Sequence, residues 1–217
     1  VLAGAGSNCT AESLRLVRHA GKGGADGVLV ITPYYNKPTQ AGLIAHYKAV
    51  AEATSLPVVI YNVPGRTGVS ILPETVAQLA EIKNIVGVKE ASGSVDMTSA
   101  ILTSCNVDVL SGDDSLTLPI MAVGGCGVIS VAANVIPEKM VALTRAVAKG
   151  DLPMAERLHR QLYPLFRALF IETNPVPVKA ALAMMGKIKE RYRLPLVPMQ
   201  PANRAKLQAE LERVLAG

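Results

Sequence analysis

The sequence predicts an α/β fold in which parallel strands are each followed by a helix. Continuous apolar runs alternate with amphipathic helical segments over the first 150 residues, which is the pattern of parallel strands covered by helices. The chain has 217 residues, of which 50% are hydrophobic and 18% are charged, so it is long enough for one large core. These observations favour either a (β/α)8 barrel or an open, doubly wound sheet.

Six apolar runs are expected to form the strands, and each is followed by a helical segment. The expected strands are residues 1–7, 27–33, 57–63, 85–92, 107–113 and 127–135. The helices that follow them are expected at residues 10–22, 39–54, 73–82, 96–104, 116–123 and 137–149. No strand is expected after Gly150, where three helical segments follow at residues 151–169, 175–185 and 202–215.

The number of strand–helix units decides which of the two folds is expected. A closed (β/α)8 barrel has two more units than the six seen here. We therefore expect a (β/α)8 TIM barrel that lacks its first two βα units in this chain. Residues 1–150 would hold βα units 3 to 8 of the barrel, and residues 151–217 would form a C-terminal helical extension. An open, doubly wound sheet of six strands is the alternative.

The composition favours a soluble, cytoplasmic protein that binds neither a membrane nor a nucleic acid. No run of 18 apolar residues and no export signal occurs. The basic residues behind the net charge of +5 are scattered along the helices, which favours a solvated surface over a phosphate-binding stripe. Cys9, Cys105 and Cys126 lack metal-ligand spacing, so we expect buried, reduced thiols and no metal site.

A lysine interrupts one of the apolar runs, in the segment VGVKEAS at residues 86–92. An ammonium group is costly to move out of water, and a protein usually responds by lowering the pKa of the amine until it is neutral and nucleophilic. Strand alternation places Lys89 on one face with Ile85, Gly87 and Ala91, near the carboxyl end where barrel enzymes keep their catalytic groups. The alternative is a lysine that reaches solvent from the end of its strand.

The preceding strand, in the segment YNVPGRT, adds a tyrosine and an arginine. Tyr61 is expected to point in the same direction as Lys89 from the neighbouring strand. Its hydroxyl could relay protons while an imine forms. Arg66 follows the turn and offers a planar fork that suits a substrate carboxylate. The alternative for Tyr61 is an aromatic residue of the core, and the alternative for Arg66 is a salt bridge in the loop.

Other motifs give weaker signals. Tyr34 and Tyr35 follow the strand at residues 27–33, and because they are adjacent, one could face a pocket while the other supports an interface. The segment GAGSNC has cysteine where a GxGxxG motif needs its third glycine, which argues against a nicotinamide oxidoreductase. The segments SGDD and GGCGVIS could approach a small ligand closely. Asp113 and Asp114 are expected at an acidic helix N-terminus and not at a metal.

Taken together, the motifs identify a family. The segments ITPYYNKPTQ, YNVPGRT, VGVKEASG, SGDDSL, GGCGVISVAANV and FIETNPVPVKAAL resemble the dihydrodipicolinate synthase family of (β/α)8, class I aldolase-type lyases. The resemblance extends over the whole chain from the third barrel strand. It implies condensation of pyruvate with L-aspartate 4-semialdehyde to 4-hydroxy-tetrahydrodipicolinate, in lysine (diaminopimelate) biosynthesis. It implies no cofactor other than a covalent pyruvate imine.

The resemblance also assigns roles to residues. Lys89 would form the Schiff base with pyruvate, Tyr61 would relay protons, and Tyr35 would join the relay of a neighbouring subunit. Arg66 would bind the carboxylate of the second substrate, and the backbones of Gly112 and Ile129 would line the pyruvate pocket. An inhibitory site for lysine would lie at a dimer interface, in a homotetramer built as a dimer of dimers; its members would be Asn8, Glu12 and Tyr34.

Two alternative functions stay open on the sequence. Sibling pyruvate aldolases of the N-acetylneuraminate lyase type share the lysine and the tyrosine, although the carboxylate-binding Arg66 disfavours a sugar substrate. The family's GTTGE segment has no counterpart in this sequence. A catalytically silent barrel fragment that acts as a binding partner is therefore the alternative from a different class.

Overall fold

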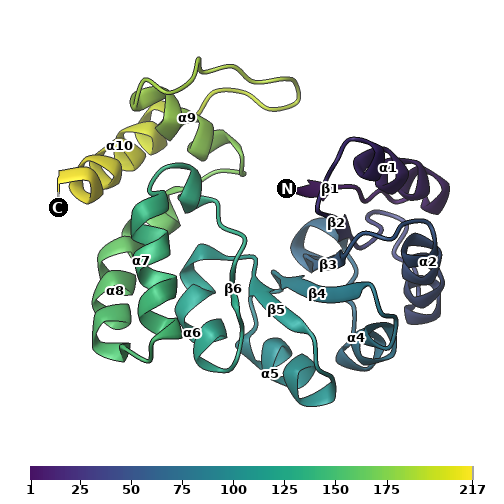
Figure 1. Cartoon of the computed structure of the whole chain (residues 1–217). Helices are drawn as coiled ribbons and strands as arrows, with labels where there is room; N and C mark the ends of the chain where they lie inside the picture. The colour runs from purple at the N-terminus through teal and green to yellow at the C-terminus, as the bar shows by residue number, and fades with distance from the viewer. Residues whose placement is uncertain (217) are drawn as a thin grey trace. The chain divides into compact units, whose positions relative to one another are not determined.

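The computed structural model describes residues 1–216 (Figure 1). The chain divides into two compact units. The first, which we call the sheet unit, contains Val1–Gly112 and Pro119–Val128. The second, which we call the helical unit, contains Asp113–Leu118 and the residues from Ile129 onward.

The sheet unit is built on one parallel sheet of six strands, which lie in the order of the sequence. A doubly wound sheet reverses its strand order at a switch point, and this sheet has no such reversal, so that alternative is wrong. Right-handed crossovers that all step in one direction place their helices on one face. All six predicted strands are present: β1 Leu2–Gly4, β2 Gly27–Ile31, β3 Val58–Asn62, β4 Ile85–Glu90, β5 Asp108–Ser111 and β6 Gly127–Val128.

The helices between the strands agree with the predicted segments to within a few residues. They lie along one side of the sheet in Figure 1: α1 Thr10–Lys22, α2 Gln40–Glu52, α4 Pro73–Ala80 and α5 Val95–Ser104. Two of them begin at a hydroxyl cap, because Thr39 Oγ1 accepts from Gly42 N at 3.2 Å and Ser94 Oγ accepts from Met97 N at 3.1 Å. A short helix, α3 Pro64–Thr67, was not predicted.

The main core of the sheet unit lies between the strands and these helices. Every second strand residue points into it, and the helices contribute the apolar side chains that cover these residues. The fully buried strand residues are Val28, Val30, Val58, Ile60, Val88 and Val109. Tyr47 of α2 is also fully buried, and its hydroxyl donates to Val30 O at 3.0 Å. The opposite face of the strands is therefore left for a site.

The predicted alternation along β4 is wrong at its first two residues. Ile85 belongs to the same core cluster as Val88, whereas Val86 is 39% exposed. The cause is a register shift between Val58 and Val59 of β3, which leaves Val86 without a partner in the ladder. From Gly87 onward the alternation follows the prediction.

The helical unit contains the remaining elements. Its α-helices are α7 Pro137–Ala148, α8 Leu152–Ala168, α9 Val176–Met184 and α10 Pro201–Ala216, and its short 3-10 helices are η1 Asp114–Leu116 and η2 Ala132–Asn134. Helix α8 packs against α7 and α10 through buried residues such as Leu162 and Leu165. Helix α6, Thr117–Ala122, is divided between the two units. The predicted strand at 127–135 ends at Val128 and is followed by η2, so its second half is wrong.

The cysteine prediction is also wrong in part. Cys9 and Cys126 are exposed and Cys105 is half-buried, and all three are free thiols. Cys9 immediately precedes α1, and Cys126 immediately precedes β6, so both lie in connecting segments at the surface, where the usual burial of cysteine does not hold. Within residues 1–216, no helix combines the length and apolar character that a membrane crossing requires. The same residues contain no group of three metal-ligating side chains.

Candidate active site

Lys89 and Tyr61 lie side by side near the carboxyl edge of the sheet. They are register partners on β4 and β3. The Nζ atom of Lys89 lies 4.1 Å from the centroid of the Tyr61 ring, and both side chains are half-buried. The predicted juxtaposition is confirmed, and an amine in contact with an aromatic face is partly removed from water.

Gly112 leaves the space that the lysine side chain needs. A methyl group at this position would lie 2.5 Å from Ala91 Cβ and 3.2 Å from Lys89 Cε. The Gly112 N–H donates to Glu90 O at 2.7 Å, which holds the turn after β5 against the end of β4. Any larger residue would therefore crowd the amine or separate the two strand ends.

A buried polar network lies on the opposite face of the same strand ends. The Glu90 carboxylate is 1% exposed and accepts from Asn62 Nδ2 at 2.8 Å and from Ser92 N at 2.6 Å. The Asn62 Oδ1 atom in turn accepts from Ile71 N at 3.2 Å. Asn62 and Glu90 are register partners adjacent to Tyr61 and Lys89. These hydrogen bonds hold the backbone next to Tyr61 and Lys89 in place from the core-facing side of the strands.

The loop after β2 presents one strained tyrosine. Tyr35 has a positive φ of 73° and is 89% exposed, whereas Tyr34 is 39% exposed. Only glycine adopts this backbone conformation easily, so the surrounding structure must impose it on Tyr35. The Tyr35 N–H donates to Thr67 O at 3.2 Å, which ties the loop to the end of α3. The two adjacent tyrosines thus differ in exposure, and the assignment of one to a pocket and the other to an interface stays a prediction.

The residues predicted to bind lysine lie near one another. Asn36 Nδ2 donates to Asn8 O at 2.9 Å, so the loop that contains Tyr34 contacts the start of α1. Glu12, in the first turn of α1, accepts from Ser7 Oγ and pairs with Arg15 at 3.1 Å. Helix α1 and the β2 loop thus bring Asn8, Glu12 and Tyr34 into one neighbourhood of the sheet unit.

The remaining predicted residues have distinct positions. Arg66 lies in α3, immediately after β3, and its side chain is exposed. Ile129 directly follows β6, is half-buried, and belongs to the helical unit. Asp113 precedes η1 and Asp114 is its first residue, so the expected acidic helix start is confirmed.

Burial distinguishes Asp114 from a simple helix cap. It is 2% exposed, and its carboxylate accepts from Ser130 Oγ and from Ala132 N. Burial raises the pKa of the Asp114 carboxyl, although these donors act in the opposite direction. The carboxylate thus bonds to the segment that contains Ile129.

Comparison with known proteins identifies the family. The sequence profile of the Dihydrodipicolinate synthetase family matches residues 1–214. The chain belongs to this family.

Members of the dihydrodipicolinate synthetase family resemble the chain closely. A 4-hydroxy-tetrahydrodipicolinate synthase of Geobacter sulfurreducens is 57% identical over 211 residues, which are 96% of this chain and 73% of that protein. The solved structure of the 4-hydroxy-tetrahydrodipicolinate synthase of Methylacidiphilum fumariolicum has a TM-score of 0.98 at 52% identity and covers 99% of this chain and 73% of its own. A family member from Cyanidioschyzon merolae, solved with lysine bound, has a TM-score of 0.96 at 40% identity over 99% of this chain and 74% of its own.

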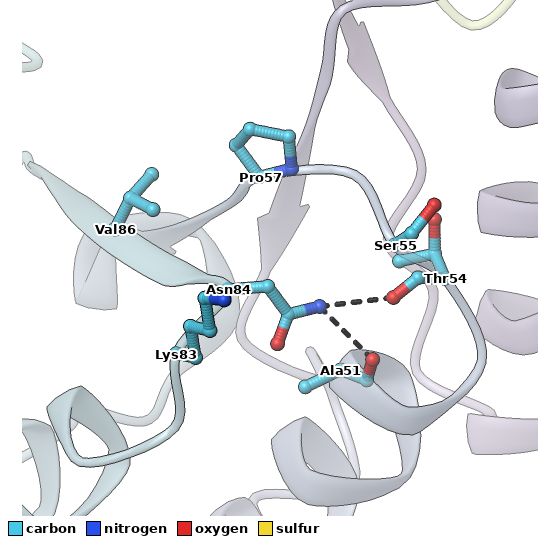
Figure 2. A pocket seen from close by; sticks show the side chains of 7 residues that line it. All are labelled: Ala51, Thr54, Ser55, Pro57, Lys83, Asn84 and Val86. Carbon is cyan, nitrogen blue, oxygen red and sulfur yellow. Dashed lines mark hydrogen bonds between the residues drawn. The ribbon is translucent and has the colours of Figure 1, made fainter.

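A depression of the sheet unit lies at the amino edge of the strands, away from the lysine–tyrosine pair. It has a volume of about 490 Å³ and is lined by Ala51, Thr54, Ser55, Pro57, Lys83, Asn84 and Val86 (Figure 2). Asn84 Nδ2 donates to Ala51 O at 3.0 Å and to Thr54 O at 2.9 Å. In (β/α) barrels the carboxyl edge carries catalysis and the amino edge carries stability. The depression is therefore not the expected active site of a family member.

The buried polar pair next to Lys89 and Tyr61 was not predicted. Asn62 and Glu90 are almost fully buried, yet neither was predicted to have a role, and Asp114 was expected only as part of an acidic helix start. A signal was available for Asn62 and Glu90. Asn62 and Glu90 are polar residues at core-facing positions of apolar strands, and buried polar groups of this kind need partners.

Proposed function

We propose that the chain condenses pyruvate with L-aspartate 4-semialdehyde to 4-hydroxy-tetrahydrodipicolinate, as a lyase of the class I aldolase type. Membership of the family supports the reaction. The observation that carries the proposal for this chain is the amine of Lys89, which lies 4.1 Å from the centre of the Tyr61 ring and beside Gly112. This arrangement suits imine chemistry, because it combines a partly desolvated nucleophile with a proton-relay group.

The reaction assigns one role to each of these residues. The Lys89 amine attacks the keto carbon of pyruvate, and the carbinolamine loses water to give the imine. Loss of a methyl proton gives an enamine, which attacks the aldehyde carbon of the semialdehyde. The amino group of the adduct then displaces Lys89 from the imine carbon, which closes the ring and regenerates the amine. Tyr61 relays the protons, and Arg66 binds the carboxylate of the semialdehyde.

The other predicted roles extend this proposal. The six strands would correspond to βα units 3 to 8 of an eight-stranded barrel, with residues 1–150 holding them and residues 151–217 forming the helical extension. Gly112 and Ile129 would line the pyruvate pocket, and Tyr35 would join the relay of a neighbouring subunit. Tyr35 is 89% exposed, which suits a side chain that contacts a neighbouring subunit. A cytoplasmic location and catalysis without a cofactor stay predictions.

Lysine is proposed as an inhibitor, bound near Asn8, Glu12 and Tyr34. The relative from Cyanidioschyzon merolae was solved with lysine bound. In this chain, the hydrogen bond between Asn36 and Asn8 O keeps the β2 loop close to α1, where Glu12 offers a carboxylate to a basic ligand. A homotetramer, formed as a dimer of dimers, would place this site at a subunit interface.

A substrate panel tests the proposed reaction. The purified chain is incubated with pyruvate and L-aspartate 4-semialdehyde, and in parallel with N-acetylneuraminate, and the products are identified by mass spectrometry. We expect the cyclic dicarboxylate from the first mixture and no pyruvate release from the second. Cleavage of N-acetylneuraminate without condensation of the semialdehyde would contradict the proposal.

A further inference from the structure

We propose that Asp114 is a positioning residue for pyruvate binding, because its buried carboxylate holds the segment 129–132 in place. The inference rests on the proposed function, in which the backbone of Ile129 lines the pyruvate pocket. Asp114 does not have to touch the substrate. It acts through the residues that directly follow Ile129.

The contacts of Asp114 support this role. One carboxylate oxygen accepts from Ser130 Oγ at 2.5 Å, and the other accepts from Ala132 N at 2.9 Å. Ser130 Oγ also accepts from Ala133 N at 2.8 Å. The Asp114 carboxylate therefore accepts directly from Ser130 Oγ and Ala132 N, and Ser130 Oγ in turn accepts from Ala133 N, all at the start of η2.

The backbone at Asp114 is also held in place. Thr117 Oγ1 donates to the Asp114 carbonyl oxygen at 2.9 Å, and η1 packs against α8. On the other side, η2 packs against α7 and α9. Asp114 thus joins two short 3-10 helices, each of which is supported by long helices of the same unit. The position of the segment 129–132 is set relative to this helical framework.

The chemistry of the site requires a carboxylate and not an amide. Ser130 Oγ and Ala132 N both donate to Asp114, and the two carboxylate oxygens are both acceptors. An asparagine would offer one acceptor and one donor, so one of the two partners would face an N–H group. Inside the protein a lost partner is costly, because no water replaces it. Asp114→Asn should therefore loosen the segment without a change of size.

The test compares Asp114→Asn with Asp151→Ala. Asp151 is an exposed N-cap of α8 in the same unit, and its Oδ1 accepts from Met154 N at 3.1 Å. Both variants lose a carboxylate that bonds to the backbone, but only Asp114 contacts the segment 129–132. For Asp114→Asn we expect the KM for pyruvate to rise about tenfold, which corresponds to about 1.4 kcal/mol, with kcat within about threefold. For Asp151→Ala we expect an unchanged KM and a lower melting temperature.

Amide hydrogen exchange gives a second readout that does not need activity. Exchange at residues 129–134 should become faster in Asp114→Asn and stay unchanged in Asp151→Ala. An unchanged KM for pyruvate in a folded Asp114→Asn variant would overturn the inference, and so would unchanged exchange in this segment. A wild-type chain that forms no product while Asp114→Asn still speeds this exchange would instead contradict the proposed function.

Discussion

The two edges of the sheet use similar residues for different purposes. Lys89 and Asn62 lie at the carboxyl edge, and Lys83 and Asn84 lie at the amino edge. Lys83 is exposed at the rim of the depression in Figure 2, whereas Lys89 is half-buried over the ring of Tyr61. Asn84 bonds to backbone carbonyls at the end of α2, whereas Asn62 bonds to the buried Glu90.

The difference shows what converts a lysine into a candidate nucleophile. At the amino edge, the charged group stays in water and the amide side chain joins neighbouring backbone segments. At the carboxyl edge, the amine is partly desolvated over an aromatic ring, and Gly112 has no side chain that would crowd Lys89. Residue type alone does not distinguish the two lysines; their surroundings do.

Removal of the carboxyl-edge lysine should have the largest effect. In Lys89→Ala no imine can form, and we expect kcat/KM for the condensation to fall by roughly 10⁴-fold or more. Lys83→Ala is the matched control and should retain wild-type kinetics. Steady-state assays of both variants measure the difference. Substantial activity in Lys89→Ala would show that the amine is not the nucleophile.

Removal of the Tyr61 hydroxyl should have the next largest effect on activity. Tyr61→Phe keeps the ring beside Lys89 and removes the proton relay, so we expect kcat to fall by about 10²-fold to 10³-fold. Tyr47→Phe is the control, because the Tyr47 hydroxyl donates to Val30 O within the core. It should lower the free energy of unfolding by about 1 kcal/mol and leave kcat unchanged. Equal activity of the two variants would remove Tyr61 from the mechanism.

Crowding at the carboxyl edge should have a smaller effect. In Gly112→Ala the new methyl group would meet Ala91 Cβ at 2.5 Å. We expect kcat/KM to fall by about 10-fold to 100-fold, because overpacking of about 1–3 kcal/mol must be relieved beside the amine. Gly127→Ala is the control, since its nearest neighbour, Leu110 Cδ2, lies at 3.8 Å. If both variants kept full activity, Gly112 would not be needed for the space around Lys89.

Loss of the amino-edge asparagine should change stability and not activity. Asn84→Ala removes the donor to Ala51 O and Thr54 O, and we expect the free energy of unfolding to fall by about 1–3 kcal/mol. The values of kcat and KM per folded molecule should match the wild type. Urea titration and kinetics on the same preparations test both parts. A specific loss of kcat would contradict the assignment of this edge to stability.

Substitution of His46, which lies at neither edge of the sheet, should have the smallest effect, and this effect is on the pH dependence of stability. His46 is buried, its Nδ1 lies 2.9 Å from Thr10 Oγ1, and burial lowers its pKa. Below a pH of about 6.5, the His46 imidazole is protonated more readily in the unfolded chain than in the folded chain. The free energy of unfolding therefore decreases as the pH falls below this value. Urea midpoints measured from pH 7.5 to 5.5 should decrease less steeply in His46→Gln. An identical slope would show that His46 does not contribute.

Local patterns predicted much of the fold and the central pair of the site. The alternation of apolar runs and helices gave the six strands, and the boundaries of α1 were predicted as observed. The alternation of β3 and β4 placed Tyr61 beside Lys89. These features depend on periodicity and on neighbouring strands, both of which leave a signature in the sequence.

Features that depend on tertiary packing were not predictable in this way. The register shift opposite Val86 follows from how β3 and β4 fit together, and no local pattern marks it. The segment after Val128 has the composition of a strand, but its backbone turns into η2, where Ala132 N bonds to Asp114. Similarly, Cys9 and Cys126 are exposed in the segments that connect strands with helices, which composition does not reveal.

The most direct test of the difference between the edges is borohydride trapping. The purified chain is treated with borohydride in the presence and absence of pyruvate, and intact mass and peptide mapping locate any adduct. The prediction is one pyruvate-dependent adduct on Lys89 and none on Lys83. A folded chain that gives no adduct, or one that is modified equally at both lysines, would contradict the conclusion that the carboxyl edge holds an active nucleophile.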